Sequence, residues 1–113
     1  MIIKRSELYW LDWSPGRGSE QSGMRPALII QNDIGNQYSP TTIVAACSTA
    51  EVRESYPFIV HISPRESGMK QSCHVNCAHI MTIDKVHLQR KCGELSASKM
   101  SEVDQAIKAS LGL

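Results

Sequence analysis

The sequence predicts a mainly β fold with one C-terminal helix, in the form of a small, strongly bent barrel or sandwich. Short apolar segments alternate with clusters of Gly, Pro, Ser, Asn and Asp, as is usual for strands joined by tight turns. The apolar period changes to 3.6 only near the C-terminus. The 113 residues suffice for a small core and contain no internal repeat, linker or low-complexity segment, so we expect a single domain over residues 1–113.

Six segments have the composition of strands. The first, residues 7–13 (ELYWLDW), is rich in aromatic and aliphatic side chains, and Ser14-Pro15-Gly16 ends it. The sixth is weaker because Gly93 interrupts it. Residues 32–40 contain many turn formers, and we expect turns there. The remaining predicted strands are 26–31, 42–47, 58–62, 73–79 and 90–95.

The apolar residues after Ser96 fall at helical spacing and form one face of about four turns. Ser96 or Ser98 can cap the start of this helix, and Gly112 stands where it would end. We expect this face to pack against the sheet, and a partner groove or dimer contact is the alternative. The face consists of Met100, Val103, Ala106, Ile107 and Leu111.

Composition excludes few functional classes. The formal charge is +1 at pH 7, so the whole chain offers no electrostatic argument for nucleic acid. No apolar run approaches the ~20 residues of a membrane span. The start, MIIKRSELYW, lacks the order of a signal peptide, and we therefore expect a cytoplasmic protein.

Four cysteines raise the question of a metal or disulfide site. Cys73, His74, Cys77 and His79 lie within seven residues, but this spacing matches no common zinc knuckle. On a strand, Cys73, Cys77 and His79 would share one face, too widely spread to close a tetrahedron, while His74 would point the other way. Without a secretion signal a disulfide framework is not expected either. We predict small buried thiols, with no metal and no cofactor.

One joint between a polar loop and an apolar strand has the residues of an anion site. In GSEQSGMRPALIIQND (residues 18–33), a loop of turn formers precedes Arg25-Pro26 and the apolar run 27–30. The proline favours extended geometry for Arg25. A guanidinium fixed at the edge of a rigid strand is suited to grip an anion. The alternative is an ordinary solvated charge at a strand end.

This block carries a resemblance to a known family. The segments YWLDWSPGRGSEQSGMRPALIIQND, IGNQYSPTTIVAA, TIDK and EVDQAIKASLGL follow one another in order. With them, the chain resembles the MazF/PemK family of bacterial toxin endoribonucleases nearly end to end. The resemblance implies a small β-barrel of the Src-homology-three type with a C-terminal helix. It also implies a homodimer that cuts single-stranded RNA without a metal and is neutralised by a cognate antitoxin.

The resemblance also implies site residues. Arg25 matches the family's catalytic arginine, and Ser48 stands where close relatives carry a catalytic threonine. Cleavage by the ribose 2′-hydroxyl leaves a 2′,3′-cyclic phosphate and a 5′-hydroxyl, and it needs proton transfer and stabilisation of charge on phosphorus. A guanidinium is a poor proton donor near neutrality, so we favour charge stabilisation for Arg25. Thr49 is a possible substitute for Ser48 and a candidate substrate contact.

The strand before TIDK departs from the family pattern. Relatives usually carry Gln, an apolar residue and Arg there, often after an acid, whereas this chain has Ala78, His79, Ile80 and Met81. A histidine ordinarily titrates near pH 6.5, so His79 is a candidate proton-transfer residue or base-stacking contact. A surface imidazole is the alternative. We also expect substrate contacts from Ser19, Glu20 and Gln21, which match the family's mobile loop, and from Asn32 after the strand.

Two other classes stay open at this point. A gyrase-poisoning toxin shares the barrel and helix but depends on a Trp-containing C-terminal tip, whereas this chain ends in SLGL. A catalytically silent relative would act as an antitoxin or as an RNA- or partner-binding module. Arg25 and the hydroxyl of Ser48 favour retained activity, while Ala78 and Met81 keep the silent alternative open.

Overall fold

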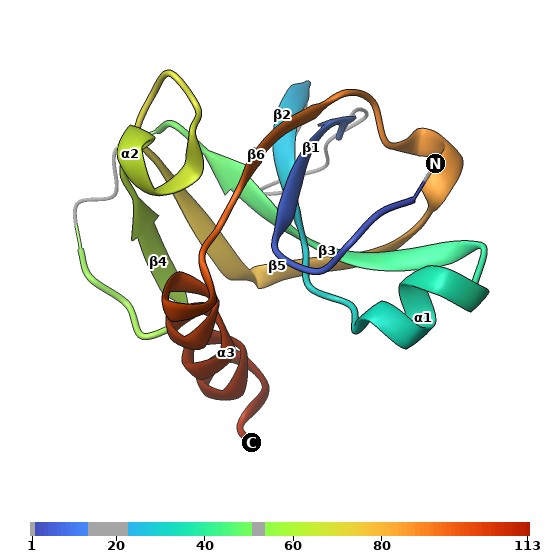
Figure 1. Cartoon of the computed structure of the whole chain (residues 1–113). Helices are drawn as coiled ribbons and strands as arrows, with labels where there is room; N and C mark the ends of the chain where they lie inside the picture. Colours follow the sequence, from blue (N-terminus) through green and yellow to red (C-terminus); the bar gives the residue numbers. More distant parts are fainter. Residues whose placement is uncertain (1, 14–22, 51–53) are drawn as a thin grey trace.

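The computed structural model describes residues 2–13, 23–50 and 54–113. Within these ranges the chain forms six strands, three α-helices and a short 3-10 helix (Figure 1). The strands are β1 (Glu7–Asp12), β2 (Met24–Ile29), β3 (Thr41–Ser48), β4 (Ile59–Ile62), β5 (Cys73–Asp84) and β6 (Lys91–Glu94). The helices are α1 (Asp33–Tyr38), α2 (Pro64–Ser67), the 3-10 helix η1 (Lys85–His87) and α3 (Ala97–Leu111).

The strands form one antiparallel sheet in the order β4-β5-β3-β2-β1-β6. The sheet curls so that its edge strand β6 lies across the core that the sheet encloses (Figure 1). Helix α3 follows β6 along the chain and lies beside β4 and β5. The predicted mainly β fold with a C-terminal helix is therefore confirmed. None of the helices in the described ranges combines the length and apolar character that a bilayer crossing needs.

A bulge in β5 is one cause of the bend. Ala45 pairs with Ile80 on β5, but its neighbour Ala46 pairs with Asn76, so residues 77–79 have no direct partner on β3. Extra residues on one strand bend it and increase its twist. A second register shift separates the pairs of Leu8 and Tyr9 between β1 and β6.

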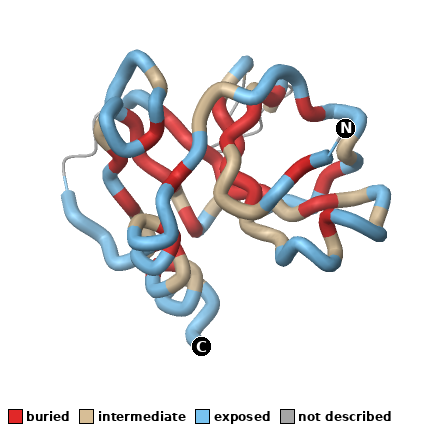
Figure 2. The backbone as a smooth tube through the Cα atoms, viewed as in Figure 1, coloured by how far each residue is buried: buried red, intermediate tan, exposed pale blue. Residues whose placement is uncertain are grey.

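The bent sheet encloses apolar side chains on both of its faces. One cluster holds Leu28, Val75 and the three buried helix residues Met100, Val103 and Ala106. The other cluster includes Ile29 and Val44. Figure 2 shows the buried residues concentrated along the strands, with the outer side of α3 exposed. The helix face is confirmed except at Leu111, which is 59% exposed in the last turn.

Caps define both ends of α3 as expected. The side chain of Ser96 accepts a hydrogen bond from the Lys99 N–H at 3.1 Å, which satisfies one of the free donors of the first turn. Gly112 closes the helix in the left-handed conformation with φ 74°. Of the two predicted caps, Ser96 is therefore the one used.

The prediction of turns over residues 32–40 is wrong in part, because α1 forms there. Asn32 caps this helix by accepting from the Gly35 N–H at 2.8 Å. The buried Asn36 accepts from the Thr42 hydroxyl at 2.7 Å, and Lys85 donates to its carbonyl. Tertiary hydrogen bonds thus stabilise a helix whose residues have low helix propensity.

Candidate active site

Arg25 is the second residue of β2, paired with Leu11 on β1. The sequence predicted that Arg25 would precede the strand, but in the structure it lies one residue inside it. Its Nε atom is buried and has no hydrogen-bond partner among the described residues. A buried donor without an acceptor costs free energy, and an anion that supplies the acceptor removes that cost. The geometry of Arg25 therefore suits an anion at the head of β2.

Ser48 is the last residue of β3, and it is buried. Its Oγ accepts the Ala50 N–H at 3.1 Å, which fixes the turn after the strand and leaves the hydroxyl proton free to donate. The last β2–β3 pair is Ala27 with Ala46. Extension of this antiparallel register by two residues brings Ser48 opposite Arg25. The strand pairing therefore puts Arg25 and Ser48, which are distant in sequence, at the same end of β2 and β3.

His79 lies in the bulge of β5, between the pairs of Asn76 and Ile80. It is half-buried, and its Nδ1 has no hydrogen-bond partner among the described residues. Because the bulge lies beside Ala45 and Ala46, His79 is about three strand residues, or ~10 Å, from Ser48 along β3. The structure therefore places His79 near the site but not beside Ser48.

The β5 residue directly opposite Ser48 is His74, which the sequence suggested only as a candidate metal ligand and not as part of an RNA-cleaving site. His74 is buried, and on its other side it pairs with His61 of β4, with the ring centroids 6.3 Å apart. Burial lowers the pKa of His74, and the neighbouring His61 lowers it further, while a hydrogen bond with the Ala50 backbone opposes these effects. Only the pairing register of the strands shows this neighbourhood.

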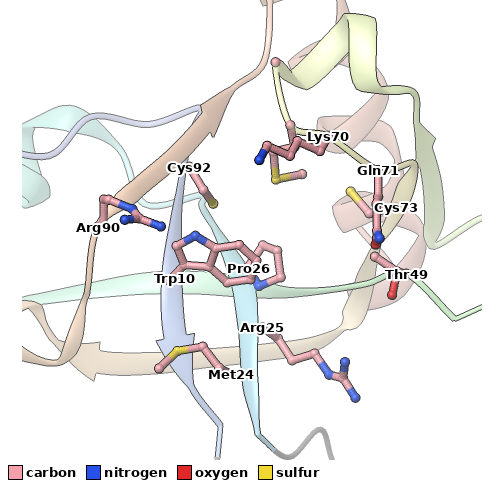
Figure 3. A pocket seen from close by; sticks show the side chains of 12 residues that line it. Trp10, Met24, Arg25, Pro26, Thr49, Lys70, Gln71, Cys73, Arg90 and Cys92 are labelled. Carbon is pink, nitrogen blue, oxygen red and sulfur yellow. The ribbon is translucent and has the colours of Figure 1, made fainter.

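A pocket of about 560 Å³ opens beside Arg25 (Figure 3). Of the predicted site residues, Arg25 and Thr49 line it, whereas Ser48 and His79 do not. Its wall also contains residues that sequence reasoning missed: Trp10, Met24, Pro26, Gly68, Met69, Lys70, Gln71, Cys73, Arg90 and Cys92. No local motif marks them, since they come from four separate segments of the chain.

The remaining predicted residues are not brought together with Arg25. Asn32 lies past the far end of β2 from Arg25, and its side chain is engaged as the α1 cap. The structure gives Asn32 a local structural role, and its role in substrate binding stays a prediction. Ser19, Glu20 and Gln21 lie outside the described residues.

The cysteines are buried thiols, as predicted, except that Cys92 is half-exposed. Burial raises the pKa of Cys47 well above its usual value and that of Cys73, Cys77 and Cys92 to about 11. At such pKa values the thiolate is scarce near neutrality, so these side chains are poor nucleophiles. No group of three or more metal-ligating side chains gathers in the described part of the chain.

Comparison with known proteins gives a consistent result. The family described as "PemK-like, MazF-like toxin of type II toxin-antitoxin system" matches residues 4–111. Endoribonuclease EndoA of Bacillus subtilis (strain 168) is 43% identical over 113 residues, covering 100% of this chain and 97% of the relative. Endoribonuclease MazF of Staphylococcus epidermidis is 45% identical over 112 residues, covering 99% and 93%.

A solved structure shares the fold. An endoribonuclease in complex with its cognate antitoxin from Mycobacterial species superimposes with a TM-score of 0.80 at 23% identity, covering 98% of this chain and 96% of that one.

Proposed function

Since the chain belongs to the PemK-like, MazF-like toxin family of type II toxin–antitoxin systems, we propose that it is an endoribonuclease that cuts single-stranded RNA. Full-length identity of 43–45% to relatives named endoribonuclease supports the activity. The structural observation that supports the proposal is the buried Arg25 Nε, which has no acceptor among the described residues and lies at the same end of β2 and β3 as Ser48.

The reaction uses the substrate's own ribose. The 2′-oxygen forms a bond to the adjacent phosphorus, the bond from phosphorus to the 5′-oxygen breaks, and the products are a 2′,3′-cyclic phosphate and a 5′-hydroxyl. One proton leaves the 2′-hydroxyl, and one is delivered to the departing 5′-oxygen. Negative charge on the phosphoryl oxygens is greatest in the transition state, so fixed donors aimed at these oxygens accelerate the step.

Arg25 and Ser48 supply such donors. Arg25 binds a phosphoryl oxygen with its guanidinium, and its orphaned Nε gains an acceptor at the same time. Ser48, whose lone pair already holds the Ala50 N–H, directs its hydroxyl proton to the same phosphate. His79 remains the candidate for proton transfer. His79 lies on β5, about three residues away from Ser48 as measured along β3. This position suits contact with the sugar or the next base better than contact with the oxygen that Ser48 binds.

We further propose two protein partners. The antitoxin proposal rests on the family and on the related endoribonuclease solved with its cognate antitoxin. A two-fold homodimer with the RNA groove crossing the interface would double the surface that a 113-residue chain offers to a strand. Light scattering at micromolar concentration should give twice the chain mass, and a fully active monomer would exclude the dimer.

Cleavage of one long RNA in EDTA tests the central proposal. The protein should produce discrete fragments whose 5′-hydroxyl ends accept phosphate from a kinase without prior phosphatase treatment, and end mapping should give the cut motif. Arg25→Ala should lower the rate by ~10²–10³, the usual loss for one transition-state donor. Arg65→Ala is the matched control, because Arg65 is exposed on α2 and outside the pocket. Activity that vanishes with chelator and returns with zinc would contradict the proposal.

A further inference from the structure

The pocket beside Arg25 has an unbalanced charge. Among the residues that the structure describes, Arg25, Lys70 and Arg90 line it and no carboxylate does, although the whole chain carries a net charge of only +1. Within the described ranges, none of these three cations has an ion pair, while Arg5, Lys91 and Lys99 elsewhere do. Unpaired cations around a concave surface favour an anionic ligand.

An aromatic surface forms the floor of this pocket. Trp10 and Pro26 are cross-strand partners on β1 and β2, so their rings lie side by side on one face of the sheet. The Trp10 N–H donates to the Arg90 carbonyl at 3.0 Å, and the Trp10 carbonyl accepts from the Gln89 N–H at 2.8 Å. These backbone bonds hold Arg90 next to the indole.

Lys70 is brought to the opposite wall by a close contact at Gly93. A Cβ added to Gly93 would lie 2.7 Å from the Ser67 carbonyl oxygen and 3.1 Å from Cγ of Met69. The chain between α2 and β5 therefore closes tightly against β6 because residue 93 has no side chain. In Figure 3 the ends of Lys70 and Arg90 lie on one side of Trp10, and the guanidinium of Arg25 lies on the other.

We propose that this pocket binds one nucleotide of the RNA next to the cut, with its base stacked on Trp10 and its phosphate held by Lys70 and Arg90. This inference rests on the proposed ribonuclease function and gives the strand a path from Arg25 across Trp10. A volume of about 560 Å³ lies in the usual range of small-molecule pockets. Aromatic rings and flanking cations are the usual means of binding single strands. Arg25 and Thr49 belong both to this pocket and to the candidate active site, which favours RNA over an acidic segment of a protein.

Binding of an uncleavable RNA tests the phosphate contacts. The probe is a single-stranded RNA of mixed sequence with a 2′-O-methyl group at every position, so it cannot be cut and does not depend on a mapped cut motif. Lys70→Gln/Arg90→Gln should weaken binding at least tenfold. It should also reduce the slope of log K against log salt by about 0.7, since the two cations hold one phosphate and each phosphate contact on a single strand contributes about 0.7. Lys4→Gln/Lys108→Gln removes the same charge from exposed positions outside the pocket and should keep most of the affinity and the slope.

Fluorescence tests the stacking contact. The chain has two tryptophans, so Trp13→Phe leaves Trp10 as the single reporter. The same probe should quench its emission, and Trp10→Leu should weaken binding about 5- to 150-fold, the range that corresponds to the loss of one stacked base. Trp10→Phe, which keeps an aromatic face, should restore most of the affinity.

The outcomes separate this inference from the proposed function. Unchanged affinity and salt slope in the Lys70/Arg90 double variant, in a protein that still cuts RNA, would overturn the pocket assignment and leave an acidic protein segment as its occupant. Cleavage that fails while the probe binds and quenches Trp10 would overturn the ribonuclease proposal and support the pocket. Equal losses in the double variant and in the Lys4/Lys108 control would also overturn the pocket assignment.

Discussion

Ser48 and His74 are direct partners across β3 and β5, and both are tied to the backbone of Ala50. Ala50 donates its N–H to the Ser48 hydroxyl oxygen, and its backbone also hydrogen-bonds the His74 side chain. The turn that follows Ser48 is therefore held from two sides. The imidazole closest to the predicted catalytic hydroxyl comes from His74, and His79 lies further along the strand.

Two replacements of Ser48 should separate the effect of its hydroxyl group on the cleavage rate from the effect of its size. We expect Ser48→Ala to lower the cleavage rate about tenfold, in line with the loss of ~1–1.5 kcal/mol for one neutral hydrogen bond. Ser48→Thr should keep nearly full rate, because the hydroxyl can still accept from Ala50 and donate to phosphate. Single-turnover cleavage of the mapped RNA measures both, and Ser101→Ala on the exposed side of α3 serves as the control. Equal losses in the Ala and Thr variants would remove the hydroxyl from the mechanism.

His79→Gln should alter the pH dependence of cleavage. If His79 transfers a proton, one limb of the wild-type pH–rate profile should depend on it, and the variant should lose that limb while still binding RNA. A pH series of single-turnover rates, with RNA affinity measured in parallel, checks this. An unchanged profile and rate would limit His79 to a binding contact. His87→Gln, at an exposed position in η1, is the control.

His74 should make folding stability depend on pH. Its pKa in the folded protein is lowered by burial and by His61, so the unfolded chain binds more protons below the usual histidine pKa of about 6.5. The free energy of unfolding should therefore fall as the pH drops from about 6.5 towards the lowered folded pKa, and level off below it. Urea titrations between pH 7.5 and 5 measure this slope. His74→Gln should reduce it, and a slope equal to that of wild type would contradict the assignment.

Gly93→Ala should destabilise the protein by about 1–3 kcal/mol, the usual cost of an overpacked position. The added methyl group would meet the Ser67 carbonyl at 2.7 Å, and backbone cannot yield as a flexible side chain does. Urea unfolding measures the change in free energy, with Ser98→Ala on exposed α3 as the control. Because the shift would move the chain that carries Lys70, the variant should also bind the uncleavable RNA less tightly. Wild-type stability would show that the contact relaxes freely.

Local patterns were enough to predict most of the fold. The predicted strand over residues 7–13 is β1 to within one residue, and the caps of α3 follow from Ser96 and Gly112. Long-range hydrogen bonds explain the failures. Asn36 and Thr42 stabilise a helix where turn residues predicted a loop, and β5 continues five residues past His79 because its second half pairs with β3.

The candidate site was predictable only in part. Arg25 was predicted as an anion contact from its place between loop and strand, whereas its catalytic role and that of Ser48 came from a resemblance. The structure adds that both residues lie at the same end of the paired strands β2 and β3. His74 could not be assigned, since its position beside Ser48 depends on a bulge that no local signal marks. Trp10, Lys70 and Arg90 were missed because the curl of the sheet, which no local pattern shows, brings them to one pocket.

The buried thiols have a practical consequence for experiments on this protein. With a pKa of about 11, the thiols of Cys73, Cys77 and Cys92 hold a thiolate fraction of about one in ten thousand at pH 7. Alkylating reagents should therefore react slowly with the folded chain and much faster once it opens. The rate at which the three buried thiols, Cys47, Cys73 and Cys77, are labelled should therefore report how often the native fold opens.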